Sequence, residues 1–167
     1  MKPSNRGFTL VEIMIVVAII ALLAAIAIPN VLRGRTTANE SSAIGNLRAL
    51  VSSLEMYRSV NNVYPATANW LANMYTTPTP DFGPPSFAHA MDGSACPPAA
   101  ASSCTQGFTY DFASAGAGTY TLNADPDVLG QTGTRSFFVD ETGVIRHCTG
   151  TGAAVTDPSI DAAPIAC

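Results

Sequence analysis

The chain has 167 residues, about one domain's worth, of which 47% are hydrophobic and only 12% are charged. Soluble domains usually carry about 25% charged residues, so part of this chain is expected to lie outside water. The formal net charge is −4 and Lys2 is the only lysine, which excludes nucleic-acid binding through a basic patch and excludes a P-loop nucleotide site.

The N-terminal part of the chain contains a long apolar run, residues 8–28, with Glu12 as its single charged residue. A helix of about 20 apolar residues spans a bilayer. Lys2 and Arg6 precede the run without an acid, so the positive-inside rule predicts a cytoplasmic N-terminus and an exported remainder. Three interpretations compete: a plain anchor, a signal peptide with the small-residue site 25–27, and a segment in which Glu12 has a function. An intramembrane carboxylate costs about 2.5–3.5 kcal/mol at the bilayer centre and is usually functional.

Residues 2–29 read KPSNRGFTLVEIMIVVAIIALLAAIAIP and resemble the N-terminus of type IV prepilins and the related pseudopilins. The signature of that family is a basic leader ending in glycine, a cleaved bond, a phenylalanine, and a glutamate five residues into the mature chain. The matching residues here are Gly7, Phe8 and Glu12. Pro29 stands where members of the family often carry a helix-weakening proline.

The resemblance implies that a prepilin peptidase cuts between Gly7 and Phe8 and methylates the new amine of Phe8. Residues 1–7 would then be a cleaved cytoplasmic leader, residues 8–29 a transmembrane and assembly segment, and residues 30–167 an exported head. Glu12 would pair with the N-terminus of a neighbouring subunit, because an ammonium and a carboxylate are each costly alone in an apolar medium and far cheaper together. Pairing within one chain is the alternative, since Phe8 and Glu12 are four residues apart on one helix face.

The helix is predicted to continue beyond the membrane to about Val60. Apolar residues recur there at spacings of three and four and form one stripe: Ile44, Leu47, Leu50, Val51, Leu54 and Tyr57. Glu55 and Arg58 are expected to pair on the exposed face. Such a helix would be roughly 80 Å long. No small domain can bury that length, so lipid or other copies of the chain must cover its first half, which favours a polymer.

Pro29 is expected to interrupt this helix, because it lacks the amide hydrogen that would bond to the carbonyl of Ala25. Two consequences stay open: a fixed kink of the helix at Pro29, or local stretching of the helix there during assembly. Family members commonly have a glycine upstream that assists such stretching, whereas the matching residue here is Ala21.

The rest of the chain is predicted to form a small β-sheet. Thr67 is expected to cap a short helix through Trp70 and Met74, and a proline-rich connection, residues 78–98, is assigned to surface or subunit contacts. Strands are predicted at 107–112, 120–124, 135–140 and 144–148, with a hairpin turn at 141–143. The predicted fold class is α+β: a long N-terminal helix, transmembrane in its first half, packs its second half against a small antiparallel sheet, as in pilins.

The four cysteines, Cys96, Cys104, Cys148 and Cys167, all fall on the exported side, where disulfides persist. Three pairings are possible, and the pairs nearest in sequence, Cys96–Cys104 and Cys148–Cys167, are predicted. The second pair would tie the C-terminal tail to the last strand and stabilise the head by roughly 3 kcal/mol. A zinc site that uses Cys148 with a histidine is disfavoured, because its spacing matches no standard site.

The chain carries no catalytic constellation, since G-x-S-x-G, H-E-x-x-H and a complete G-x-G-x-x-G are absent. No enzymatic activity, cofactor or metal is predicted. The predicted function is a structural subunit of a type IV pilus, held in the inner membrane before assembly and extracellular afterwards. The implied partners are other copies of the chain, the prepilin peptidase and the pilus assembly machinery of the inner membrane.

Two alternatives to the pilus stay open. The first is a pseudopilin of a type II secretion system, which shares the same N-terminus. The resemblance implies that major pseudopilins bind calcium in a late acidic loop and usually lack disulfides, so four cysteines and a weak acidic cluster at Asp125, Asp127 and Asp140 favour a pilin. The second alternative is a secreted, disulfide-bonded binding domain released by ordinary signal-peptide cleavage.

The processing site gives a first prediction. The intact mass of the mature protein should equal residues 8–167 plus one methyl group, less the hydrogens lost on forming two disulfides. Intact-mass spectrometry of protein purified from membranes or fibres measures this directly. A mature chain that begins at Ile28 would instead identify the secreted domain and rule out the pilin interpretation.

Overall fold

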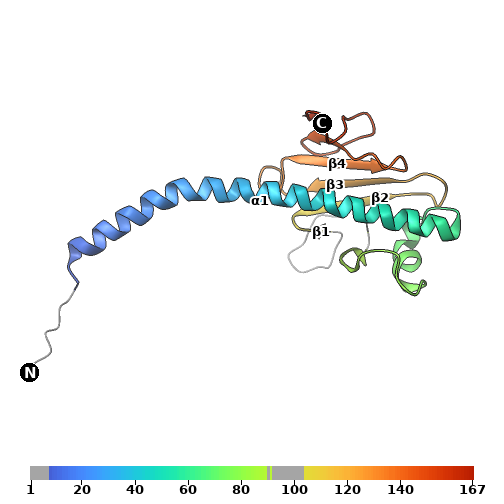
Figure 1. The fold of residues 1–167 in the computed structure, drawn as a ribbon, viewed down its shortest axis with the longest axis horizontal. Helices are drawn as coiled ribbons and strands as arrows, with labels where there is room; N and C mark the ends of the chain where they lie inside the picture. Colours follow the sequence, from blue (N-terminus) through green and yellow to red (C-terminus); the bar gives the residue numbers. More distant parts are fainter. Residues whose placement is uncertain (1–7, 90, 92–103) are drawn as a thin grey trace, which may run out of the picture. The chain divides into compact units, whose positions relative to one another are not determined.

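The computed structural model describes residues 8–89, 91 and 104–167. The chain divides into two compact units, the residues up to Arg35 and the residues from Thr36 to Cys167. One helix, α1 (Leu10–Asn61), begins in the first unit and continues into the second (Figure 1). The predicted long helix is therefore confirmed, and its ends lie close to those expected from the sequence.

The second unit contains one six-stranded sheet in the order β1-β2-β3-β4-β5-β6. The strands are β1 (Cys104–Thr105), β2 (Phe108–Ala113), β3 (Thr121–Pro126), β4 (Arg135–Asp140), β5 (Arg146–Thr149) and β6 (Ile165–Ala166). The first four pairings are antiparallel and the last, between β5 and β6, is parallel. The α+β class is confirmed, but the expectation of a purely antiparallel sheet is wrong at this edge, where the C-terminal tail returns alongside β5.

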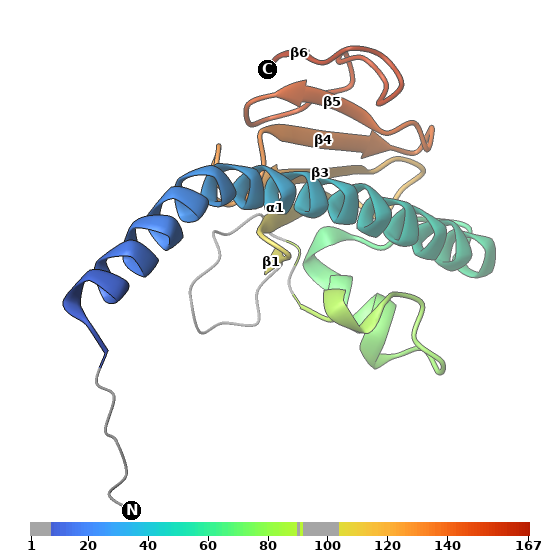
Figure 2. The ribbon, with the colours of Figure 1, turned by 60° about the vertical axis from the view of Figure 1, so that its left-hand side comes forward.

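The second half of α1 packs against one face of the sheet (Figure 2). Leu47, Leu50 and Leu54 are fully buried there, as the apolar stripe predicts. Burial alternates along β2 and β3, because successive side chains point to opposite faces of a sheet. The sheet contributes mostly aromatic and aliphatic side chains to the same core: Phe108, Tyr110, Phe112, Tyr120, Leu122, Ala124, Phe137 and Val139.

The segment after α1 forms short turns, η1 (Thr67–Asn69), η2 (Ala72–Thr76) and η3 (Pro85–Phe87), and η2 is a π-helical turn. The expected cap at Thr67 is wrong. Its hydroxyl instead donates to the carbonyls of Phe112 and Ser114, 3.2 Å away in both cases, and so fixes this segment to the end of β2. The indole N–H of Trp70 donates to the carbonyl of Phe87 at 3.1 Å, which joins η1 to η3 in the interior.

The expected pair between Glu55 and Arg58 does not form directly. Both side chains bond to the hydroxyl of the buried Tyr64, which donates to Glu55 and accepts from Arg58 at 2.9 Å. The guanidinium also lies 5.0 Å from the centre of the Tyr64 ring. A buried hydroxyl needs partners, and the two charged residues at the end of α1 supply them.

A buried carboxylate joins α1 to the sheet. Glu40 is 6% exposed. One of its oxygens accepts from the amide and the hydroxyl of Thr134 at 2.8 Å each, and the other accepts from the guanidinium of Arg135 at 2.9 and 2.8 Å. Burial raises the pKa of Glu40, but the hydrogen bonds from Thr134 and Arg135 outweigh it and hold the pKa below its ordinary value.

The C-terminal tail is covalently tied to the sheet. Cys148 in β5 and Cys167 form a disulfide, the pair expected from the sequence. His147 beside it is buried and lies 3.1 Å, through Nε2, from the carbonyl oxygen of Ala162 in the tail. Cys96 lies outside the described residues, so the Cys96–Cys104 pairing stays a prediction.

The Glu40 contact predicts an acid-sensitive contribution to stability. Glu40→Gln should lower the free energy of unfolding of the head by about 2 kcal/mol at neutral pH, since a hydrogen bond to a charged group contributes about 1.5–3 kcal/mol. The Arg135 side chain is 30% exposed, so solvent screens part of the ion pair.

The pH dependence of this contribution follows from the lowered pKa of Glu40. The stabilisation is present above the unfolded value of about 4.3 and is lost as the pH falls through the lower folded value. The Tm values of wild type and Glu40→Gln should differ at pH 7 and converge in acid. Glu141→Gln, at an exposed turn, is the matched control and should follow wild type throughout. A constant Tm difference across this range would show that Glu40 stabilises by packing alone.

Candidate functional site

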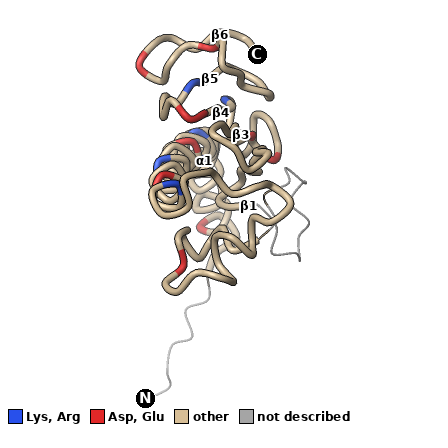
Figure 3. The backbone as a smooth tube through the Cα atoms, turned by 90° about the vertical axis from the view of Figure 1, so that its right-hand side faces the viewer, with Lys and Arg blue, Asp and Glu red and all other residues tan. Residues whose placement is uncertain are grey.

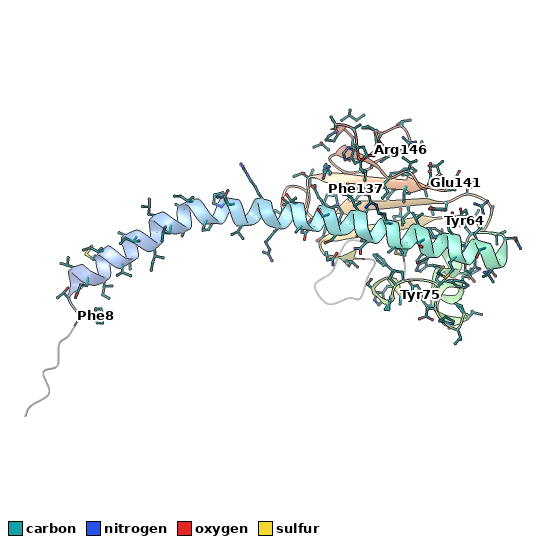
Figure 4. All side chains as sticks on the ribbon, in the orientation of Figure 1. Phe8, Tyr64, Tyr75, Phe137, Glu141 and Arg146 are labelled. Carbon is teal, nitrogen blue, oxygen red and sulfur yellow. A yellow bond between two sulfur atoms is a disulfide. The ribbon has the colours of Figure 1, made fainter. Side chains whose placement is uncertain are left out.

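The first half of α1 has an apolar surface with no protein cover within its own unit. Every large apolar side chain from Leu10 to Leu32 is half exposed or more. Figure 4 shows these side chains projecting around this part of the helix. Among the described residues α1 is the one helix long and apolar enough to cross a membrane, by length and composition. A helix that is apolar all round requires lipid or protein around it.

The start of α1 is closed by a reciprocal capping box. Thr9 precedes the helix, and its amide and hydroxyl donate to Oε2 of Glu12 at 2.8 and 2.7 Å. The amide of Glu12 donates back to the Thr9 hydroxyl at 3.2 Å. The pattern T-x-x-E is the sequence signature of such a cap. This signature is present in the sequence, but the sequence-based prediction assigned Glu12 only to charge pairing.

The geometry leaves Glu12 with capacity for a second partner. Both hydrogen bonds end on Oε2, and Oε1 receives none from the described part of the chain. A carboxylate offers about four acceptor sites, so capping and ion pairing are compatible. Phe8, labelled in Figure 4, is exposed next to this turn. Gly7 lies outside the described residues, so the cleavage site has no structural description.

Pro29 lies inside α1, which is continuous across it. The expected interruption therefore does not end the helix in this structure. The side-chain amide of Asn30 donates to the carbonyl of Ile26 at 3.3 Å, so a side chain adds a bond in the turn that proline weakens. Stretching of the helix at Pro29 during assembly stays a prediction.

The acidic residues considered for calcium have protein partners. Asp125 accepts from the amide of Gly152 at 2.9 Å, and Asp140 accepts from the amide of Thr142 at 3.0 Å in the turn after β4. Within the described residues, no three His, Cys, Asp or Glu side chains form a group that could hold a metal ion. These contacts organise turns and the tail.

Comparison with known proteins points to the same N-terminal segment. The family model "Prokaryotic N-terminal methylation motif" matches residues 2–28. The type II secretion system core protein G of Vibrio cholerae is 41% identical over 75 residues, 45% of this chain and 51% of that protein. Its counterpart in Pectobacterium carotovorum is 40% identical over 75 residues, 45% of this chain and 48% of that protein.

A pilin is also similar. The type IV major pilin PilA of Myxococcus xanthus is 48% identical over 68 residues, 41% of this chain and 31% of that protein. No solved structure matches the chain significantly. The chain spans about half the length of the core G proteins that it matches. It carries the prokaryotic N-terminal methylation motif over residues 2–28 and is similar over 68 to 75 residues to type II secretion core protein G and to a type IV pilin.

Proposed function

We propose that this protein is a structural subunit of a filament, inserted in the membrane through residues 8–29 and polymerised through the same segment after cleavage between Gly7 and Phe8. One observation carries the proposal: the exposed apolar part of α1, up to Ile28, contains a single carboxylate, Glu12, with an oxygen available for a partner. Other copies of the chain supply apolar cover, and the methylated amine of Phe8 on a neighbouring copy supplies the counter-charge.

The apolar half of α1 needs cover in the membrane and in the filament, and we propose a different cover for each. In the membrane, lipid covers the apolar half of α1 while the head, residues 30–167, lies on the exported side. In the filament, the helices of neighbouring copies replace the lipid. Glu12 would otherwise enter an apolar core as an uncompensated charge, which is strongly unfavourable. The prepilin peptidase and an inner-membrane assembly machinery are the partners that this route requires.

We propose more specifically that this filament is a type IV pilus. The Cys148–Cys167 disulfide supports it, because the resemblance described above implies that major pseudopilins usually lack disulfides. A type II secretion pseudopilus is the second candidate, favoured by the similarity to core protein G in several bacteria. Sheared surface fibres that contain this chain would support the pilus. Loss of exoprotein secretion on deletion of the gene, without surface fibres, would support the pseudopilus.

Substitutions at Glu12 and Thr9 separate the effect of the Glu12 charge on assembly from the effect of the helix cap. Glu12→Gln keeps an acceptor for Thr9 but removes the charge, whereas Thr9→Ala weakens the cap by about 1 kcal/mol and keeps the charge. Glu12→Gln should give membrane protein with few or no fibres, because loss of one partner of a buried pair costs about 3–5 kcal/mol at every subunit. Thr9→Ala should retain most fibres.

The readouts are membrane protein by blot and fibre counts in sheared fractions of cells that make only the variant. Glu12→Ala removes cap and charge together and should be no better than Glu12→Gln. Wild-type fibre numbers from Glu12→Gln cells, with a defect in Thr9→Ala cells, would show that Glu12 acts by capping its own helix and that the intersubunit pair is wrong.

A further inference from the structure

The head has an open apolar groove at the C-terminal end of α1, which we name the distal groove. Its volume is about 580 Å³. Met56 and Val60 on α1 are 52% and 65% exposed on its wall, and the Tyr57 and Phe82 rings meet edge to face at 5.2 Å beside them. The opposite wall comes from the segment after η2, which contributes Pro78, Pro80 and Asp81.

The distal groove is preformed. The amide of Phe82 donates to the carbonyl of Met74 at 2.9 Å and holds the 77–82 segment against η2. The hydroxyl of Tyr75, labelled in Figure 4, donates to the carbonyl of Pro84 at 2.9 Å, just beyond that end of the segment. The amide of Thr77 donates to the carbonyl of Ala72 at 2.9 Å and fixes the other end. A ligand would therefore meet an ordered apolar surface.

The groove carries one charge, the carboxylate of Asp81. Asp81 is exposed and has no hydrogen bond or ion pair within the described residues. Burial chiefly, and the negative charge of Asp81 to a lesser degree, raise the pKa of the neighbouring Tyr75. The chemistry that fits is a cation beside apolar side chains.

The chain itself offers such a segment. The basic residues of the described chain lie on α1, β4 and β5 (Figure 3). Arg58 donates to Tyr64, and Arg135 donates to Glu40. Arg146 donates to the carbonyl of Asp157, and Arg33 also has a partner. Arg35 and Arg48 remain exposed and without a hydrogen bond or ion pair to any described residue.

Only one of these two arginines stands beside large exposed apolar side chains. Arg48 is flanked on the exposed helix face by Gly45 and Ser52, which are small. Arg35 lies three and four residues after Leu32 and Val31, which are 56% and 60% exposed, so the three share one face of α1. Both apolar residues follow Pro29 and so lie beyond the segment assigned to the membrane.

We propose that the distal groove of one copy receives residues 28–35 of a second copy, with Arg35 of the second copy paired to Asp81 of the first. The proposal rests on the proposed function, since it needs a polymer. The two surfaces are different parts of the chain, so the contact is heterologous and need not close into a ring. Each copy can then use its groove for one neighbour and its 28–35 segment for another, which is how a filament grows.

Charge reversal tests the proposal. In cells that make only the variant, Asp81→Arg and Arg35→Asp should each lower sheared-fibre yield about tenfold or more, because like charges placed together are strongly unfavourable. The double variant should recover most of the wild-type yield. Arg35→Asp removes a cation from the exported side, so the positive-inside rule predicts normal insertion.

Co-production of the two single variants distinguishes pairing between copies from pairing within one chain. When the two variants alternate along a filament, the groove of each Asp81→Arg copy receives the 28–35 segment of an Arg35→Asp copy, and the two introduced charges are opposite. At the next contact the unchanged Asp81 of the Arg35→Asp copy meets the unchanged Arg35 of the other variant. Every contact is then matched, so fibres should return although neither variant assembles alone. Pairing within one chain gives no such rescue, and absence of rescue would overturn the proposal.

Glu141→Arg is the matched control, since it reverses an exposed acid in the turn after β4 and should leave fibre yield unchanged. Membrane protein by blot and the Tm of each variant check that the head is intact. Leu129→Ser tests a different occupant, the exposed apolar turn between β3 and β4. Loss of fibres with Leu129→Ser together with wild-type yield for both charge reversals would overturn the proposal in favour of that turn.

The outcome separates this inference from the proposed function. If the wild-type protein forms fibres and the charge-reversal variants give the same fibre yield, the distal-groove contact is contradicted and the proposed function is not. A mature wild-type protein that forms no fibre and supports no secretion would contradict both.

Discussion

The structure depends on one electrostatic constraint, a carboxylate placed among apolar side chains at the start of a long helix. Glu12 is the only charged residue in the run 8–28. The capping box satisfies Oε2 locally, because Thr9 donates to it from both its amide and its hydroxyl. The negative charge itself is not neutralised by these bonds. An apolar polymer core can accept it only together with a cation, and the cleavage proposed before Phe8 would create one four residues earlier in the chain.

The head fixes the second half of α1, whereas the apolar side chains of the first half have no protein cover within their own unit. The leucines of the helix stripe and the aromatic side chains of β2, β3 and β4 form one core. Glu40 adds a directional contact at the start of this packed half, through Thr134 and Arg135. The Cys148–Cys167 disulfide holds the tail on the far edge of the sheet. A rigid head is what a repeating filament contact, such as that proposed for the distal groove, requires.

The sequence predicted those features that depend on local pattern. The α1 stripe is periodic, β2 and β3 alternate, and β4 and β5 flank a turn signature, so these elements are predicted with boundaries off by at most two residues. Strands β1 and β6 have two residues each and carry no pattern of their own. They exist because a neighbouring strand and the tail disulfide place them.

Contacts between residues far apart in the chain could not be predicted from local sequence patterns. Glu40 meets Thr134 and Arg135 across more than ninety residues, and nothing in the local sequence marks it as buried. Threonine favours helix caps, which predicts a cap at Thr67, but its hydroxyl donates to carbonyls at the end of β2 instead. The capping box at Thr9 and Glu12 is the opposite case, since its signature is local and readable.

A cryo-EM reconstruction of sheared filaments tests the central claim most directly, because it shows where the carboxylate of Glu12 lies in the assembled state. The account predicts an oxygen of Glu12 within about 3 Å of the methylated amine of Phe8 on a neighbouring copy, with the bonds to Thr9 of its own chain retained. A filament in which Glu12 contacts only Thr9 and the Phe8 amine lies in solvent or pairs elsewhere would contradict it.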